Sequence, residues 1–224
     1  MSGGDASGAN QRTTSYTTNA LNQYSSIQNP RSLDVLVRSS VTPTVTATGY
    51  QVNVIDQGDY NRAEISFAQN DPNTPNAQWI HVDVSVGQTN LSSGNLWLPA
   101  ATVGPTYDAD GNMTCDGRWL NVWDGENRLV SQQNAVFGAP NLLLEFSYDH
   151  RGRRIAKKVT DLDVYPYHVL SNLRFAYDAW NMVAEFEAVG STLSMVRSYT
   201  WGPDLSNTLQ GAGGVGVKGR IDIE

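Results

Sequence analysis

A short pattern recurs along the chain and constrains its fold more than any other feature. The pattern is an aromatic residue, then Asp, two variable residues, and then Gly or Asn. The clearest copies span residues 107–113, 123–129 and 148–154, and weaker copies span residues 177–183 and 18–24. A repeated local pattern indicates an architecture built from one small unit. The sequence therefore favours a scaffold of stacked hairpins over a catalytic pocket.

Each copy predicts a strand, a turn and a returning strand. The aromatic residue offers a broad surface at the end of a strand. The Asp side chain can bond to the backbone two residues further on, and Gly and Asn both tolerate a positive φ. We therefore expect these residues to shape turns, and neither to bind a ligand nor to catalyse a reaction. The turn residues are Asp108, Gly111, Asp124, Asn127, Asp149, Gly152, Asp178 and Asn181.

Several of these motifs, in this order, resemble the YD-repeat (RHS) family. Residues 107–130 resemble two consecutive repeats, and residues 144–155 resemble the next one. Residues 199–216 resemble the stretch that follows the repeats in this family, and residues 17–24 resemble a further repeat. The resemblance implies a long β-sheet that spirals into a hollow shell. It also implies a parent protein that is typically secreted or located at the cell surface.

The family's self-cleaving motif begins with Asp-Pro and continues into Gly-Leu, after the stretch that resembles residues 211–216. Here the chain reads Val-Lys-Gly-Arg-Ile-Asp-Ile-Glu over residues 217–224, and Asp71-Pro72 lacks the Gly-Leu sequel. We therefore expect a truncated fragment that lacks the autoprotease and any C-terminal payload.

Residues 31–103 differ in texture from the repeats and predict short strands separated by turn residues. Alternation is clearest over residues 80–86, where Ile80, Val82, Val84 and Val86 share one face. Short strands at this spacing suggest a small sandwich or barrel. The expected strands span residues 35–37, 41–47, 50–55, 63–67, 79–86 and 96–98.

The expected fold class is all-β, with almost no helix. The repeats form a hairpin-rich antiparallel sheet, wound or spiral, because their uneven spacing does not fit a strict solenoid. The expected division is a disordered N-terminus over 1–11, a first repeat over 12–30, an inserted β module over 31–103, a YD-repeat sheet over 104–210, and a Gly-rich divergent tail over 211–224.

Charge and hydropathy exclude several classes of protein. The net charge is −7 and the pI is near 4.9, which argues against a nucleic-acid partner. No stretch approaches the roughly 20 apolar residues that a membrane helix needs. The first residues lack the basic region and apolar core of a signal peptide. The cellular location stays open.

The sequence offers no recognisable catalytic, cofactor or metal site. His81, His150 and His168 have no partner at the spacing of zinc ligands, and no Ser lies in a Gly-x-Ser-x-Gly elbow. Residues 108–112 resemble the opening of a calcium loop, but Trp119 stands where the closing acid would be. We therefore expect no cofactor, no bound metal and no enzymatic activity.

Paired carboxylates leave a hydrolase as the least favoured alternative. Glu185 and Glu187 flank Phe186 on an expected strand. Alternation predicts that both carboxylates face water and that Phe186 is buried.

Three functions remain, in order of preference. The first is a structural or interaction module that encloses or displays another polypeptide, or associates with itself through open sheet edges. The second is carbohydrate binding through exposed aromatic residues, for which Trp180 is the best candidate because it occupies a variable turn position. The third is a hydrolase.

Overall fold

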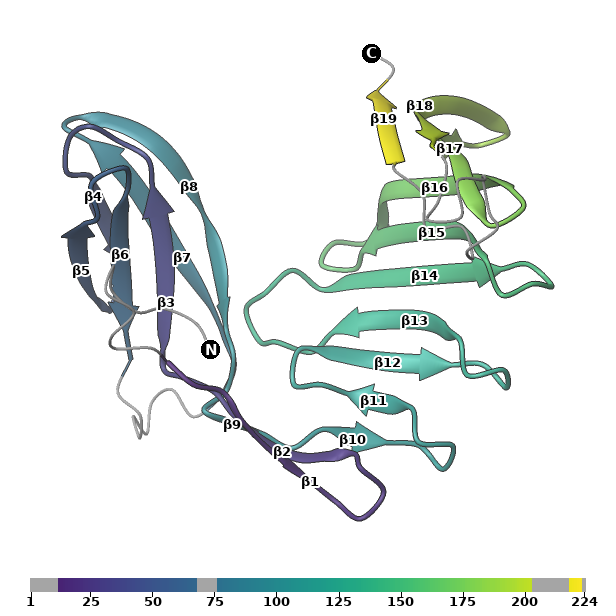
Figure 1. Ribbon diagram of the computed structural model, residues 1–224, viewed down its shortest axis with the longest axis horizontal. Helices are drawn as coiled ribbons and strands as arrows, with labels where there is room; N and C mark the ends of the chain where they lie inside the picture. The colour runs from purple at the N-terminus through teal and green to yellow at the C-terminus, as the bar shows by residue number, and fades with distance from the viewer. Residues whose placement is uncertain (1–11, 68–75, 203–217, 223–224) are drawn as a thin grey trace. The chain divides into compact units, whose positions relative to one another are not determined.

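The computed structural model describes residues 12–67, 76–202 and 218–222 (Figure 1). Its regular structure in these ranges consists of β-strands, without helices, and neighbouring strands pair antiparallel. This confirms the all-β, hairpin-rich class. The N-terminus over 1–11, for which disorder is expected, lies outside the described residues.

The chain divides into two compact units. The first comprises residues 1–120 and 134–139, and the second comprises residues 121–133 and 140–224. The boundary expected at residue 104 therefore falls inside the first unit.

A small sheet of the first unit joins two segments that lie far apart in the sequence. Strands β1 (Ser15–Thr18) and β2 (Tyr24–Gln28) form a hairpin, and β9 (Thr102–Val103) adds to the free side of β2. The segment that resembles a first repeat is thus held next to the residues that precede the main group of repeats.

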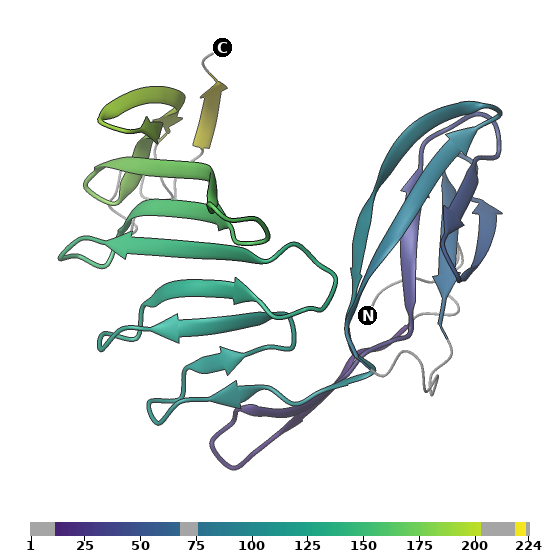
Figure 2. The ribbon, with the colours of Figure 1, turned by 180° about the vertical axis from the view of Figure 1, so that it is seen from behind.

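Strands within residues 32–66 and 78–98 form two three-stranded sheets that share one core (Figures 1 and 2). One sheet has the order β3-β6-β5 and the other the order β4-β7-β8. The strands are β3 (Ser32–Val37), β4 (Thr44–Ala47), β5 (Gln51–Asp56), β6 (Asn61–Ser66), β7 (Gln78–Val86) and β8 (Thr89–Leu98).

Alternating side chains build the core between these two sheets. On β7, Ile80, Val82 and Val84 are buried, whereas His81 between them is exposed. Ile65 of β6 and Leu98 of β8 are completely buried, which stabilises the fold by about 1.5–3 kcal/mol for each side chain. These strands hydrogen-bond among themselves and do not enter the sheet of the repeats.

From β10 to β19 the order of strands in the sheet is the order in the chain. Each strand therefore pairs with the strands that come before and after it, as consecutive hairpins require. The strands are β10 (Thr106–Tyr107), β11 (Met113–Cys115), β12 (Trp119–Trp123), β13 (Leu129–Asn134), β14 (Leu142–Tyr148), β15 (Arg154–Asp161), β16 (His168–Asp178), β17 (Asn181–Val189), β18 (Thr192–Trp201) and β19 (Lys218–Asp222).

A β-bulge accompanies most repeat turns. The strand register shifts directly before Thr18, Tyr107, Tyr148 and Tyr177, which is the aromatic position of each pattern or, in the first copy, its Thr equivalent. A bulge bends its strand and increases the local twist. The residue before each turn thus also re-aims the strand end.

Part of the segment over 211–224, which we expected to be a Gly-rich divergent tail, is described by the structure. Residues 218–222 form β19, which pairs with β18 from Arg197 to Trp201. The Gly-rich residues 211–217 lie outside the described residues. In the described part of the chain, no helix is long and apolar enough to cross a membrane.

Candidate functional site

Four of the five repeat copies fold into the same loop, in which one side-chain oxygen accepts two backbone hydrogen bonds. Oδ1 of Asp149 accepts from the N–H of Arg151 at 2.9 Å and from the N–H of Arg153 at 3.0 Å. The same oxygen accepts the two equivalent bonds, at 2.8–3.0 Å, in the copies of Asn19, Asp108 and Asp124. The donors lie two and four residues after the acceptor in every copy.

The backbone closes each loop around that oxygen. The N–H of Asp149 donates to the carbonyl of Arg153 at 3.0 Å, and the N–H of Gly152 donates to the carbonyl of Asp149 at 3.0 Å. Gly152 has φ = 76°, a conformation that L side chains other than Asn and Asp rarely adopt. The same slot has positive φ at Asn22, Gly111 and Asn127.

The second carboxylate oxygen is also occupied. Nε of Arg153 donates to Oδ2 of Asp149 at 2.7 Å, and Nε of Arg128 donates to Oδ2 of Asp124 at 2.8 Å. In the copy of Asp108, Nδ2 of Asn112 donates to Oδ2 of Asp108 at 3.1 Å. Both oxygens of each carboxylate thus hold donors of their own loop, which leaves little capacity for a metal ion or for proton transfer.

These donors lower the pKa of the turn carboxyls. For Asp149, desolvation acts to raise the pKa, but hydrogen bonds from the side chain and backbone of Arg153 and from the N–H of Arg151 outweigh it and lower the pKa to about 2. The hydrogen bond from the N–H of Arg128 is the main cause that lowers the pKa of Asp124. The carboxylates are therefore held in the charged, hydrogen-bond-accepting form.

Three of the four loops are also connected by a hydrogen bond to the aromatic residue of a later hairpin. The hydroxyl of Tyr148 donates to the carbonyl of Leu129 at 2.8 Å, and the hydroxyl of Tyr177 donates to the carbonyl of Arg154 at 2.9 Å. In both cases the acceptor lies five residues after the Asp of the preceding loop. Likewise, the hydroxyl of Tyr107 donates to the carbonyl of Tyr24 at 3.2 Å, and Tyr24 lies five residues after Asn19.

A tryptophan performs the same task after the last loop. Nε1 of Trp201 donates to the carbonyl of Met182 at 2.7 Å, at the start of the strand that returns from Asp178. The rings of Tyr107, Tyr148, Tyr177 and Trp201 thus each supply a hydrogen-bond donor, which a Phe at these positions could not do.

Arginine side chains make a second connection between consecutive loops. The guanidinium of Arg128 lies 5.4 Å from the ring centre of Tyr148, and that of Arg153 lies 5.0 Å from the ring centre of Tyr177. Arg153 also donates to the carbonyl of Ala179 in the next turn. Sequence reasoning missed these arginines, although Arg recurs four residues after Asp in two copies.

The fifth copy departs from the expected turn. Asp178 pairs directly with Asn181, so that only Ala179 and Trp180 form the turn between them. The positive φ of 49° falls on Ala179, and Asn181 is instead a buried residue of β17. The expectation of a positive φ at Asn181 is wrong because this turn is shorter than the others. Trp180 lies at its tip with 59% of its surface exposed.

In the first unit, three tryptophans surround an arginine. The guanidinium of Arg118 lies 5.2–5.8 Å from the rings of Trp79, Trp97 and Trp119. Trp79 and Trp97 are direct cross-strand partners on β7 and β8. Such cation–π contacts stabilise the packing of a loop on the sheet. These rings are thus occupied by the chain itself.

A Ser, a His and an Asp meet on the exposed face of β7 and β8, but not in the order of a catalytic triad. Oγ of Ser93 donates directly to Oδ1 of Asp83 at 2.6 Å and lies 3.3 Å from Nε2 of His81. In a triad the imidazole stands between Ser and Asp. This contact with Ser93 is also the main cause that lowers the pKa of Asp83. The group is a surface hydrogen-bond network.

The paired carboxylates of β17 do not lie as expected. Glu185 is buried, its Oε2 lies 3.0 Å from Nη1 of Arg197, and its other oxygen accepts the hydroxyl of Tyr199. Glu187 is half-buried, accepts the N–H of Asn172 at 2.7 Å, and flanks a Phe186 that is only half-buried. The prediction that both carboxylates face water is wrong, because β18 supplies partners that cover Glu185.

The structure also places the remaining reactive groups. Among the described residues, no cluster of three or more His, Cys, Asp or Glu could hold a metal ion. Cys115 lines an open cavity of about 430 Å³ together with Val103, Val136 and Phe137. None of the described residues that line this cavity is a His, Asp, Glu, Lys or Arg that could act as a base for the thiol.

Comparison with known proteins finds a partial similarity. No family model matches the chain. Over 97 residues, or 43% of the chain, it is 29% identical to the tRNA nuclease WapA of Bacillus subtilis strain 168. The tRNA(Glu)-specific nuclease WapA of Bacillus subtilis subsp. natto and the tRNA3(Ser)-specific nuclease WapA of Bacillus spizizenii match with the same identity and length. The matched residues make up 4% of each relative.

Proposed function

We propose that this chain is a non-catalytic structural and interaction module, a segment of a YD-repeat shell that encloses or displays another polypeptide or mediates contact at a surface. One observation supports the proposal: the carboxylate oxygens of the repeated Asp residues accept hydrogen bonds from the backbone of their own turns. Asp149, for example, accepts two backbone N–H groups on one oxygen and Arg153 on the other. Carboxylates that accept hydrogen bonds in this way stabilise the conformation of the turn.

The links between consecutive hairpins support a wall-like role. Tyr148 and Tyr177 each bond to the strand that returns from the preceding turn. Arg128 and Arg153 each stack on the tyrosine of the following turn. Neighbouring hairpins are thereby fixed to one another by side chains as well as by strand pairing, as the wall of a shell would need.

The partial similarity fits a segment of a much longer protein. The relatives are named as nucleases that act on tRNA, and the matched part is 4% of their length. For this chain we propose a role in scaffolding and not in tRNA cleavage. The net charge of −7 supports this choice, because nucleic-acid binders usually carry a basic face.

A cleavage assay with the whole chain tests the proposal. Incubation with total tRNA, with and without divalent cations, should leave the tRNA intact. Asp149→Asn and, as a control outside the repeats, Asp59→Asn should behave alike in this assay. Cleavage by the wild-type chain that Asp149→Asn abolishes, while circular dichroism shows an unchanged fold, would overturn the proposal.

Carbohydrate binding is a second candidate, favoured by the exposure of one aromatic ring. Trp180 stands at the tip of the hairpin between β16 and β17, with 59% of its surface exposed. An exposed indole can stack on a sugar ring, whereas Trp79, Trp97 and Trp119 already contact Arg118. Glycan-array signals that disappear in Trp180→Ala would support this candidate, and signals unaffected by the change would remove it.

A further inference from the structure

Strand β8 is an edge strand without the usual protection. It is the outermost strand of the sheet β4-β7-β8. Its ten residues, Thr89–Leu98, include no charged residue and no proline, and its register with β7 is regular from Ser92 to Leu98. Natural edge strands commonly carry charges or proline that prevent pairing with another strand. The free edge of β8 is thus suited to accept one.

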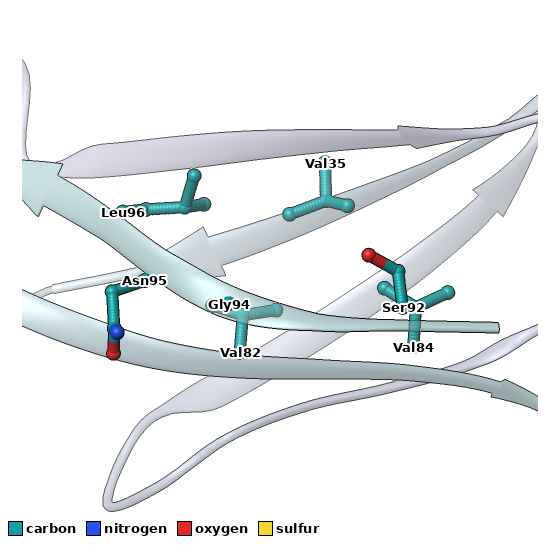
Figure 3. Close-up of a pocket in the computed structure, with 7 residues that line it drawn as sticks. All are labelled: Val35, Val82, Val84, Ser92, Gly94, Asn95 and Leu96. Atoms are coloured by element: carbon teal, nitrogen blue, oxygen red, sulfur yellow. The ribbon is translucent and has the colours of Figure 1, made fainter. Parts of the chain in front are cut away.

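The core beside this edge is incompletely filled (Figure 3). A pocket of about 140 Å³ lies between Val35 of β3 and Val82 and Val84 of β7. The residues of β8 that pair with these two valines are Gly94 and Ser92, so that small side chains stand where a core needs large ones. A Cβ added at Gly94 would meet nothing within 4 Å.

We propose that β8 pairs antiparallel with β8 of a second copy of this chain, about a two-fold axis that passes through Gly94. The proposal deepens the interaction role proposed above, on which it rests, by naming the edge and the partner. Pairing of this kind is isologous, because the same strand serves in both copies. It joins two three-stranded sheets into one of six strands.

Side-chain size selects this register. Residues directly opposite each other in an antiparallel pair share one face of the sheet. With Gly94 opposite Gly94 of the second copy, Ser92 lies opposite Leu96 of the second copy. Leu96 of each copy therefore contributes its side chain to the pocket of the other copy, beside Ser92. A register centred on Ser93 would place Ser92 opposite Gly94 and leave both pockets unfilled.

Charge also favours a second copy as the occupant. Two identical charged edges would repel each other, and the chain as a whole carries a net charge of −7. Strand β8 can meet itself without such repulsion, since none of its residues is charged. The other uncharged edge strands of the described residues, β1, β4, β9 and β10, have only two to four residues, whereas β8 has ten.

Sedimentation equilibrium of the whole chain, from micromolar to submillimolar concentration, tests the proposal. Wild type and Gly94→Ala should sediment as dimers, because the alanine methyl group fits the open space. Gly94→Glu should weaken the dimer by more than about tenfold, since two carboxylates would meet at the axis. The matched control is Gly125→Glu, which adds the same charge at another glycine with open surroundings.

A cross-linking experiment tests the register. In a Cys115→Ser background, Gly94→Cys should form a disulfide between two chains on mild oxidation, because opposed Cα atoms lie about 4.5–5.5 Å apart. Asn95→Cys should not, because its counterpart in the second copy lies diagonally, about 7–8 Å away. Cross-linking through Asn95→Cys alone would overturn the register.

A wild-type chain that stays monomeric throughout, or a dimer that Gly94→Glu leaves unchanged, would overturn the pairing through β8. The tRNA assay with Asp149→Asn does not depend on this edge. Failure of the pairing is therefore distinguishable from failure of the scaffold role. Circular dichroism of each variant checks that the fold is retained.

Discussion

Removal of one hydroxyl should measure how firmly consecutive repeats are connected. Tyr148→Phe keeps the ring, and with it the contact to the guanidinium of Arg128 at 5.4 Å. It deletes the 2.8 Å hydrogen bond to the carbonyl of Leu129. It also deletes a long contact from Arg154, at 3.4 Å, which contributes little.

The expected loss follows from that single bond. A typical intramolecular hydrogen bond stabilises a protein by about 0.5–1.5 kcal/mol. Its removal destabilises the protein further if the buried acceptor is left without a donor. The side chain of Tyr148 is half-buried, so that water can partly replace the lost donor. We expect the free energy of unfolding to fall by about 1–2 kcal/mol. At this chain length, each kcal/mol lowers Tm by about 2–4 °C.

Urea unfolding followed by circular dichroism measures the loss. Tyr165→Phe is the matched control, because that side chain is 83% exposed and its change should cost less than about 0.5 kcal/mol. Equal stabilities of the two variants would refute the connection between repeats. A loss well above 3 kcal/mol for Tyr148→Phe would show that the ring itself had moved.

Three further changes probe the turns and the tryptophan cluster. Asp149 has a pKa of about 2 in the folded protein and a pKa near 3.9 in the unfolded chain. Its contribution to stability is therefore complete above about pH 4 and is lost as the pH falls towards 2. In urea melts, the stability difference between wild type and Asp149→Asn should shrink over that pH range, and a constant difference would contradict the lowered pKa. Gly152→Ala forces a β-carbon into φ = 76° and should cost about 1–2 kcal/mol in the same melts, whereas Gly125→Ala should cost less than half as much, and equal costs would contradict the assigned turn. Arg118→Ala should shift tryptophan fluorescence to the red, and an unchanged spectrum would contradict contact with the three rings.

Interactions within a few residues were readable from the sequence. The side chain of Asp149 bonds to N–H groups two and four residues away, and Gly152 lies between them. Both roles depend only on local backbone geometry, which residue type encodes directly. The alternation that predicted the strands of residues 32–98 is local in the same sense.

Interactions that depend on strand register were not readable. Tyr148 meets Leu129 because β13 and β14 pair in one particular register, which no local pattern specifies. The burial of Glu185 likewise depends on Arg197 of the next strand. The slot at Asn181 was misassigned because the turn after Asp178 is shorter, and chain length inside a turn cannot be judged from a five-residue pattern.

The most direct test of the scaffold interpretation is an NMR titration of the carboxyl carbons of Asp108, Asp124 and Asp149. We predict that all three have pKa values below the ordinary range of Asp, with Asp149 near 2. We also predict that calcium, magnesium or zinc ions leave these resonances unchanged. Ordinary or raised pKa values, or resonances that move on addition of a metal ion, would contradict a purely structural role for the repeated aspartates.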